Sequence, residues 1–271
     1  MTVPELIARL NLPEQTATAI QYIPLPENHS ALKSSFFLKT SLFSDFAKAD
    51  PTGLTVLKLY LHWAIDTWSR YHDLGIPEEY FWDSMKDIPI WCGDYLAKHG
   101  APGFREWEWV ANSLRLEVIR IGRLQFEPAL LSQNVTANGK GFPAGTPILD
   151  VHIPAGEPLT PEAVLASLNQ APDFFKRYTQ THFPLFHCHS WLLSPDLKAL
   201  LPKHSRIIQF QNLFTIYRTD NEERQAEERV FGFLSNDPHN YPEVTALQKA
   251  IKRYLLDGKD VMMGAGIRAV D

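Results

Sequence analysis

The spacing of apolar side chains divides the chain into a helical first part and a second part that mixes strands with helices. The clearest helix is predicted over residues 50–75, where large apolar side chains recur every three or four positions. Asp50 suits the cap of this helix, Pro51 its first turn and Gly75 its end. The apolar stripe is wide, which predicts that this helix is central to its domain.

Two further stretches of this first part have helical spacing. Residues 78–100 indicate one or two helices that are interrupted at Pro89 and ended by Gly100, and residues 105–115 indicate another. Tryptophans are concentrated in this part of the chain, so we expect it to have a bulky aromatic core of its own.

The pattern changes near Leu116, where β-branched and aromatic residues begin to alternate with polar ones. Strands are predicted over 116–128, 148–153, 185–193, 206–219 and 228–234. Helices are predicted over 159–182, 194–201 and 240–258. Thr160 suits the cap of the first of these helices and Pro161 its first turn.

The order of these elements predicts the topology. A helix between strands 148–153 and 185–193 implies that the two strands are parallel neighbours, and the last two predicted strands can pair as a hairpin. The fold class is therefore α+β, with a helical N-terminal domain over 1–115 and a mixed-sheet domain over 116–271.

Composition and charge argue against several classes of protein. Hydrophobic residues make up 45% of the chain and charged residues 21%, as in ordinary soluble proteins. The net charge of -5 gives no sign of a nucleic-acid partner or of a membrane surface. No signal peptide or membrane span is recognised, and Cys92 and Cys188 form no CxxC pair. We therefore expect a cytoplasmic protein without nucleic-acid or membrane partners.

The segment LFHCHSWLL, residues 185–193, places polar side chains in an apolar strand, where they cost free energy unless other groups satisfy them. On a strand, His187 and His189 share one face and Cys188 lies on the other. The segment is open to a catalytic, a metal-binding and a structural interpretation. In the structural one, the histidines are core residues bonded to backbone or water.

Five segments together resemble a family of bacterial proteins described as GNAT-like acyltransferases with a separate helical N-terminal domain. The segments are IGRLQFE (121–127), ILDVHIPAGEPLTPEAV (148–164), CHSWLLSPDL (188–197), IIQFQNLF (207–214) and VFG (230–232). The resemblance implies a GNAT-like C-terminal domain that transfers an acyl group from acyl-CoA, acetyl-CoA or a carrier thioester. The acceptor would be an amine or a hydroxyl group.

The resemblance also implies where the cofactor binds. In GNAT-like folds two parallel strands splay apart and the pantetheine of acyl-CoA lies between them. The pyrophosphate meets backbone N–H groups at the start of the following helix, where the helix dipole favours an anion. The corresponding turn in this sequence contains Gly156, Glu157, Leu159 and Thr160.

Two departures from the usual pattern keep other functions open. The turn contains one glycine, and its prolines at 154, 158 and 161 lack N–H groups. Leu201 stands about where many GNAT enzymes have the tyrosine that protonates the leaving thiolate. A non-catalytic binding or scaffold protein with the same fold is therefore the alternative, and a metal-dependent enzyme is a third possibility.

The candidates for catalysis are histidines and one cysteine. His152 or a histidine of the strand 185–193, His187 or His189, would remove a proton from the acceptor, because the unperturbed pKa of histidine lies near neutrality. Cys188 would instead be a nucleophile that takes the acyl group beside a histidine. Arg120 and Arg123 are a further possible anion site, but we expect them on the solvated face of a strand.

We predict that the protein binds no structural metal. A site formed by His187, His189 and either His152 or Asp150 lacks a fourth ligand at the usual spacing. Elemental analysis of untagged protein should find neither zinc nor iron in stoichiometric amount. Chelators should leave the melting temperature unchanged. Stoichiometric metal that disappears in a His189→Ala variant would contradict this prediction.

Overall fold

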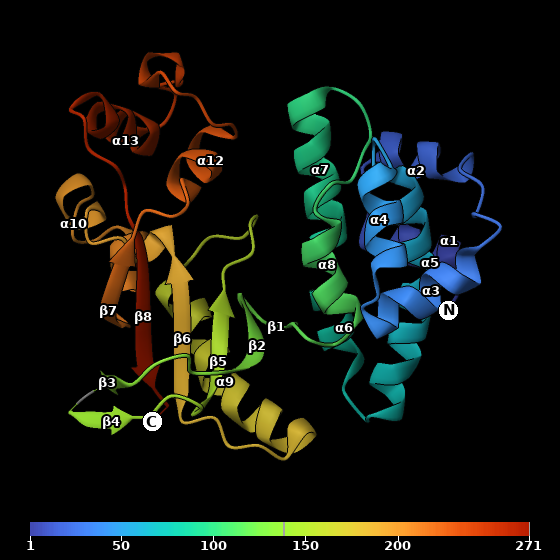
Figure 1. Ribbon diagram of the computed structural model, residues 1–271, viewed down its shortest axis with the longest axis horizontal. Helices are drawn as coiled ribbons and strands as arrows, with labels where there is room; N and C mark the ends of the chain where they lie inside the picture. The colour runs from blue at the N-terminus through green and yellow to red at the C-terminus, as the bar shows by residue number, and fades with distance from the viewer. Residues whose placement is uncertain (138, 271) are drawn as a thin grey trace. The chain divides into compact units, whose positions relative to one another are not determined.

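The structure is a computed structural model that describes residues 1–137 and 139–270. Its contacts divide the chain into two compact units (Figure 1). Unit 1 contains Met1–Ile121 and Pro154–Gly156, and unit 2 contains Gly122–Ile153 and Glu157–Asp271. Among the described residues, no helix combines the length and apolar character that crossing a bilayer requires.

Unit 1 is helical, as the spacing of its apolar residues predicts. Its helices are α1 (Val3–Leu10), α2 (Glu14–Gln21), α3 (His29–Leu38), α4 (Ser41–Ala49), α5 (Leu54–Asp73), α6 (Glu78–Met85), α7 (Asp87–His99) and α8 (Trp107–Leu114), followed by the short strand β1 (Ile119–Ile121).

Helix α5 is the central helix predicted from the sequence, but it begins later than expected. Residues 51–53 form a bend before it, and Asp50 still caps the helix from outside. The Oδ2 atom of Asp50 accepts the N–H groups of Thr55 at 2.9 Å and Val56 at 3.1 Å. The helix stops at the predicted place, because Gly75 adopts a φ of +66° that favours glycine.

The break between the next two helices lies earlier than Pro89. Helix α6 ends at Met85 and α7 begins at Asp87, so Pro89 falls in the first turn of α7. A proline is tolerated there because its missing N–H would have had no partner within the helix. Gly100 ends α7 with a φ of +66°, as predicted.

The expected aromatic core of unit 1 is present. Phe36, Phe43, Tyr60 and Trp63 are at most 3% exposed, and the rings of Phe36 and Trp63 lie 4.8 Å apart. The hydroxyl of Tyr60 donates to the backbone oxygen of Trp107 at 2.9 Å, which satisfies its polar end inside the core.

Arg120 and Arg123 are not on a solvated strand face, so that expectation is wrong. They are 1% and 6% exposed. The N–H of Arg120 donates to Ser84 Oγ at 2.9 Å, and the N–H of Arg123 donates to Ser167 Oγ at 2.8 Å. Ser84 lies on α6, and Ser167 lies on the long helix of the second unit, so a helix covers each arginine. The alternation of residues along the strand does not predict this burial, because it depends on distant helices.

Unit 2 contains a mixed sheet with helices, which confirms the α+β class. Its elements are β2 (Leu124–Leu130), β3 (Val135–Ala137), β4 (Lys140–Phe142), β5 (Pro147–His152), α9 (Pro161–Thr179), β6 (Leu185–Ser190), η1 (Trp191–Leu193), α10 (Leu197–Leu200), α11 (Arg206–Gln211), β7 (Thr215–Asp220), α12 (Gln225–Phe231), η2 (Pro238–Asn240), α13 (Ala246–Leu256) and β8 (Met263–Ala269). Within unit 2 the strand order of the sheet is β2-β5-β6-β8-β7. Strands β3 and β4 form a separate antiparallel pair.

The predicted parallel pair is confirmed. Strands β5 and β6 pair in parallel over Ile148–Asp150 and Leu185–His187. Beyond these residues β5 continues beside β2, and β6 continues beside β8, without pairing with each other. The two parallel strands therefore part toward their C-terminal ends.

Helix α9, between the two parallel strands in sequence, covers one face of the sheet. Its start is as predicted, because the Thr160 hydroxyl accepts the N–H of Ala163 at 3.3 Å and Pro161 follows directly. The ring of Phe126 on β2 lies 6.4 Å from that of Phe175 on α9 and 5.9 Å from that of Phe186 on β6. These contacts identify the side of the sheet that faces α9.

Of two strands predicted near the C-terminus, the first is right only over residues 215–219 and the second is wrong. The segment 206–219 contains helix α11 before β7, because the Ser205 hydroxyl accepts the N–H of Ile208 and caps a helix there. The segment 228–234 is not a strand but lies mainly in α12, which ends at Gly232 with a φ of +81°. The partner of β7 is β8, a strand missed in the sequence that lies between β6 and β7.

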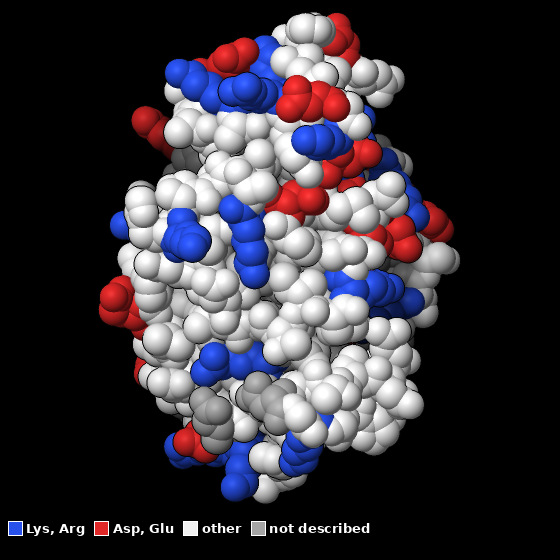
Figure 2. Space-filling model, turned by 90° about the vertical axis from the view of Figure 1, so that its left-hand side faces the viewer, with Lys and Arg blue, Asp and Glu red and all other residues white. Residues whose placement is uncertain are grey.

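Charged side chains of both signs lie among uncharged ones on the surface seen in Figure 2. The protein also has exposed ion pairs, such as Lys33 with Asp66 at 2.7 Å. Pairs of this kind contribute about 0–1 kcal/mol each, so the fold depends chiefly on its buried contacts.

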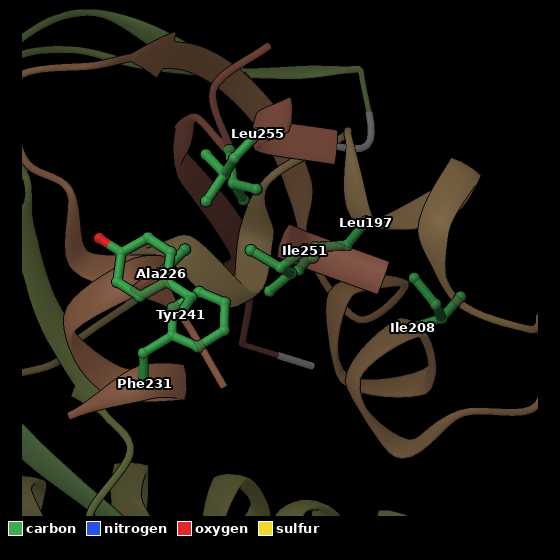
Figure 3. Packing of buried hydrophobic residues seen from close by; sticks show 8 residues of the cluster. Leu197, Ile208, Ala226, Phe231, Tyr241, Ile251 and Leu255 are labelled. Atoms are coloured by element: carbon green, nitrogen blue, oxygen red, sulfur yellow. The ribbon is translucent and has the colours of Figure 1, made fainter. Parts of the chain in front are cut away.

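One group of buried contacts lies under the C-terminal helices of unit 2 (Figure 3). The ring of Phe231 stacks on that of Tyr241 with centroids 4.0 Å apart. At the edge of this group, Glu227 is 4% exposed and accepts hydrogen bonds from Arg224 Nε and the Tyr241 hydroxyl, both at 2.7 Å. Burial alone would raise the pKa of Glu227, but the bonds from Arg224 and Tyr241 lower it overall.

Replacing Glu227 by glutamine should destabilise the protein by about 1–3 kcal/mol, because the amide cannot accept all of these hydrogen bonds. The carboxylate stabilises the fold above its unfolded pKa, and this contribution is lost as the pH falls through the lower folded pKa. Urea unfolding should therefore show the difference between wild type and Glu227→Gln at neutral pH and a smaller difference in acid.

Glu243→Gln is the matched control, because the carboxylate of Glu243 also has a cationic partner, Lys252, but its side chain is 55% exposed. Its effect should stay within about 0.5 kcal/mol. Equal effects of the two variants would contradict the role assigned to Glu227.

Candidate active site

Three histidines on one face of the unit 2 sheet each contact a carboxylate. His152 lies on β5, and His187 and His189 lie on β6. Because side chains alternate along a strand, these histidines point away from Phe186 and the face covered by α9. The predicted sharing of a face by His187 and His189 is present, and we call this side of the sheet the histidine face.

His187 connects two other residues at the point where the parallel strands part. Its Nδ1 atom lies 2.9 Å from Asp150 Oδ1, and its Nε2 atom lies 3.0 Å from the hydroxyl of Tyr217 on β7. An ionised carboxylate can only accept, so Nδ1 donates to Asp150 and the Nε2 of a neutral imidazole accepts from Tyr217. Burial raises the pKa of Tyr217; the charge of Arg218 lowers it and that of Asp150 raises it further.

His189 contacts a second carboxylate on the same strand as Tyr217. Its Nε2 atom lies 3.1 Å from Asp220 Oδ2, which also lies 3.3 Å from a guanidinium nitrogen of Arg218. The other oxygen of Asp220 has no hydrogen-bond partner among the described residues. Asp220 thus orients His189 through Oδ2, while its Oδ1 atom can accept a further hydrogen bond.

His152 contacts Glu127 across the pair of strands β2 and β5. The distance between His152 Nε2 and Glu127 Oε2 is 3.1 Å, and the two side chains are 28% and 39% exposed. By comparison, the side chain of His187 is 15% exposed. The His152 pair is therefore more accessible to solvent than the His187 pair.

Cys188 lies apart from these histidines. It is completely buried, on the side of β6 that faces α9. Burial, with a further contribution from the charge of Asp150, raises the pKa of the Cys188 thiol well above its usual value. A buried neutral thiol is a weak nucleophile, so the geometry gives no support to Cys188 in catalysis.

The four residues predicted to bind the cofactor lie in the turn between β5 and α9. Gly156 has a φ of +103°, and it and Glu157 are exposed, whereas Leu159 and Thr160 are partly buried. The hydroxyl of Thr160 caps α9 by accepting the N–H of Ala163, and the N–H of Thr160 donates to the backbone oxygen of Pro158 at 3.0 Å. The backbone N–H of Thr160 is therefore already in use within the turn.

The sequence pattern does not single out Glu127, Tyr217 or Asp220, which contact His152, His187 and His189 respectively. Glu127 alternates with Phe126 in a predicted strand, which is a weak signal for a polar face. Tyr217 and Asp220 are three residues apart, so a regular strand would direct them to opposite faces. A bulge between Ile216 and Arg218 changes this register and brings both residues to the histidine face.

The histidine face offers no metal site. In the described ranges 1–137 and 139–270, no three His, Cys, Asp or Glu side chains are placed so that they could hold a metal ion. Each histidine of the face instead contacts a different carboxylate.

Comparisons with known families match both parts of the chain. Residues 118–268 match the family model described as the GNAT-like C-terminal domain, and residues 1–116 match that of the N-acyltransferase N-terminal domain. No match was found among the curated proteins.

Solved structures with similar folds include two acyltransferase complexes. One is an acyltransferase with decanoyl-CoA and teicoplanin, and the other an acyltransferase with CoA and 10C-teicoplanin. In both comparisons the identity is 25% and the TM-score 0.80, over 99% of this chain and 88% of the other.

Neither cysteine should react with a thiol reagent in the native protein at mildly alkaline pH. Both thiols are buried, and burial also raises the pKa of Cys92 to about 12. Both should react once the protein is unfolded by denaturant, as a spectrophotometric thiol assay can measure. Rapid reaction of one native thiol that is absent in Cys188→Ser but kept in Cys92→Ser would restore Cys188 as a candidate nucleophile.

Proposed function

Because the chain belongs to the family of proteins with a GNAT-like C-terminal domain, we propose that it is an acyltransferase that uses acyl-CoA. The reaction would move the acyl group to an amine or hydroxyl group of a separate acceptor. The complexes of the similar acyltransferases support both parts, because they contain CoA or decanoyl-CoA and the acceptor teicoplanin or its 10C form. A carrier-bound thioester is the other donor that this chemistry allows.

The observation that carries this proposal is the parting of β5 and β6. Their mutual pairing ends at Asp150 and His187, while each strand keeps its other neighbour. Backbone N–H and C=O groups on the two diverging edges then need partners. A pantetheine chain has amide groups that can supply them, and it is narrow enough to lie along a strand.

His152 is our candidate for the base that deprotonates the acceptor. It lies on β5 two residues beyond the last pair with β6, so it stands beside the opening. Glu127 orients its ring, and its partial exposure allows a proton to leave to solvent. His189, held by Asp220 on β6, is the second candidate.

The turn before α9 is our candidate for the pyrophosphate site. Its position at the N-terminus of a 19-residue helix favours an anion. We assign the contacts to backbone N–H groups around Gly156, Glu157 and Leu159, since the N–H of Thr160 already donates to Pro158 within the turn. Rigid prolines in the turn would limit the entropy lost on binding.

Two further expectations from the sequence, on domain boundaries and on cellular location, remain proposals. We propose that residues 1–115 and 116–271 are separate domains, which the division into two compact units supports. We also propose that the protein works in the reducing cytoplasm, which is supported by its two free, buried cysteines.

Acyl-CoA should raise the melting temperature of the protein, because a ligand that binds the native state stabilises it. With an amine acceptor present, mass spectrometry should detect the acylated amine, and free CoA should be released in equal amount. Replacing His152 by glutamine should lower kcat by about 10²-fold, the usual range for loss of a general base. The thermal shift with CoA should change little, because a base acts on the acceptor and not on the cofactor.

His182→Gln is the matched control, because His182 is an exposed histidine of unit 2 outside the histidine face. It should keep the wild-type rate. If neither CoA nor any acyl-CoA shifts the melting temperature at millimolar concentration, the acyltransferase proposal fails and the binding-protein alternative replaces it.

A further inference from the structure

A hydrogen-bonded chain of three residues lies at the base of the opening between β5 and β6. Asp150 and His187 are the last pair between these strands, and Tyr217 is bonded to the other side of His187. The order is carboxylate, imidazole, phenol, with distances of 2.9 and 3.0 Å. In a series of this kind the carboxylate fixes the imidazole tautomer, and the imidazole accepts the proton of the hydroxyl group.

We propose that Tyr217 is a second proton-transfer residue of the acyl transfer, with His187 and Asp150 as the residues that position it. This inference rests on the proposed function and concerns the step in which the C–N bond forms. Tyr217 suits the role because it is partly buried, and its raised pKa keeps the phenol protonated at neutral pH. The protonated phenol is the form that donates to His187.

The proton balance of the reaction requires more than one acceptor. An amine that arrives as an ammonium ion loses two protons on becoming an amide. The first leaves before the nitrogen attacks the thioester carbon, and the solvent-accessible His152 is suited to pass it to water. The second leaves as the C–N bond forms, when the nitrogen carries a positive charge.

Tyr217 takes this second proton on its oxygen while its own hydroxyl proton moves to Nε2 of His187. The resulting imidazolium is stabilised by the carboxylate of Asp150. When the C–S bond breaks, the electron pair goes to sulfur, and the proton returns through Tyr217 to give the CoA thiol. One acceptor proton ends on sulfur and the other in solvent, so His187 and Tyr217 finish as they began.

The exposures of His152 and His187 support the assignment of the first proton to His152 and of the second to the pair of Tyr217 and His187. The His187 side chain is 15% exposed and that of His152 is 28% exposed. A proton held on the more buried residue is better retained for return to sulfur, whereas one held on the more exposed residue exchanges with water. Leu201 stands at the position of the tyrosine expected from the family resemblance. Tyr217, on a different element, would supply the phenol that this position lacks.

The test compares Tyr217→Phe with Tyr254→Phe. Each variant loses one phenolic hydroxyl, and Tyr254 donates its own to Asp196 at 3.0 Å, away from the histidine face. Tyr217→Phe should lower kcat by about 10²-fold. It should leave the KM for acyl-CoA unchanged and alter the pH profile of kcat, whereas Tyr254→Phe should behave as wild type.

A second variant tests the direction of the hydrogen bonds. In Asp150→Asn, the amide can donate to Nδ1 of His187, which places the imidazole proton on Nε2 and blocks transfer from Tyr217. Long-range ¹H–¹⁵N spectra should find the Nδ1–H tautomer in wild type and the Nε2–H tautomer in the variant. The double variant with Tyr217→Phe should be little slower than either single one, because the residues act as a unit.

Two results would overturn the inference without touching the proposed function: a Tyr217→Phe enzyme with the wild-type kcat and pH profile, or an Nε2–H tautomer of His187 in wild type. A wild-type protein that binds acyl-CoA but acylates no amine or alcohol would refute the proposed transfer, and the role of Tyr217 would fall with it.

Discussion

The end of pairing between β5 and β6 is the feature on which the site depends. Continued pairing past Asp150 and His187 would satisfy their backbone groups at a net gain of about 1 kcal/mol per hydrogen bond and would close the sheet. The strands part without fraying, because β2 continues to hold β5 and β8 continues to hold β6. A pantetheine chain bound in the opening, as we propose, would recover hydrogen bonds that the fold leaves unmade.

Alternation along β6 then separates two chemical environments by the thickness of one strand. Phe186 and Cys188 face α9 and are buried, while His187 and His189 face the other side and meet carboxylates. The thiol therefore stays protonated in an apolar setting, and the imidazoles stay in polar ones. This explains how the four residues FHCH can contain both core positions and candidate catalytic positions.

The local signals in the sequence predicted much of this arrangement. Thr160 with Pro161 marked the start of α9, and alternation separated His187 from Cys188, because both features depend on a few neighbouring residues. Strand β8 was missed for a physical reason, since a Cβ atom on its Gly264 would lie 2.3 Å from the backbone oxygen of Leu193. The close approach of η1 requires glycine there, and glycine weakens the sequence signal of a strand.

The carboxylate partners were harder to predict, because each histidine meets a residue from another strand. Glu127 comes from β2, Asp150 from β5 and Asp220 from β7, so the pairs exist only when the sheet has formed in its register. A slip of one residue would turn every pair to the wrong face.

The bulge in β7 is the strongest constraint of this kind. Before it, Thr215 pairs with Ile267, and after it Arg218 pairs with Ala265, so that one residue of β7 is extra. Odd positions face the histidines before the bulge and even positions after it, which is why both Tyr217 and Asp220 reach them. Without the bulge, Tyr217 and Asp220 would lie three positions apart on a regular strand, and only one of them could face the histidines. The bulge therefore lets one strand at the edge of the sheet, β7, contact both histidines of β6.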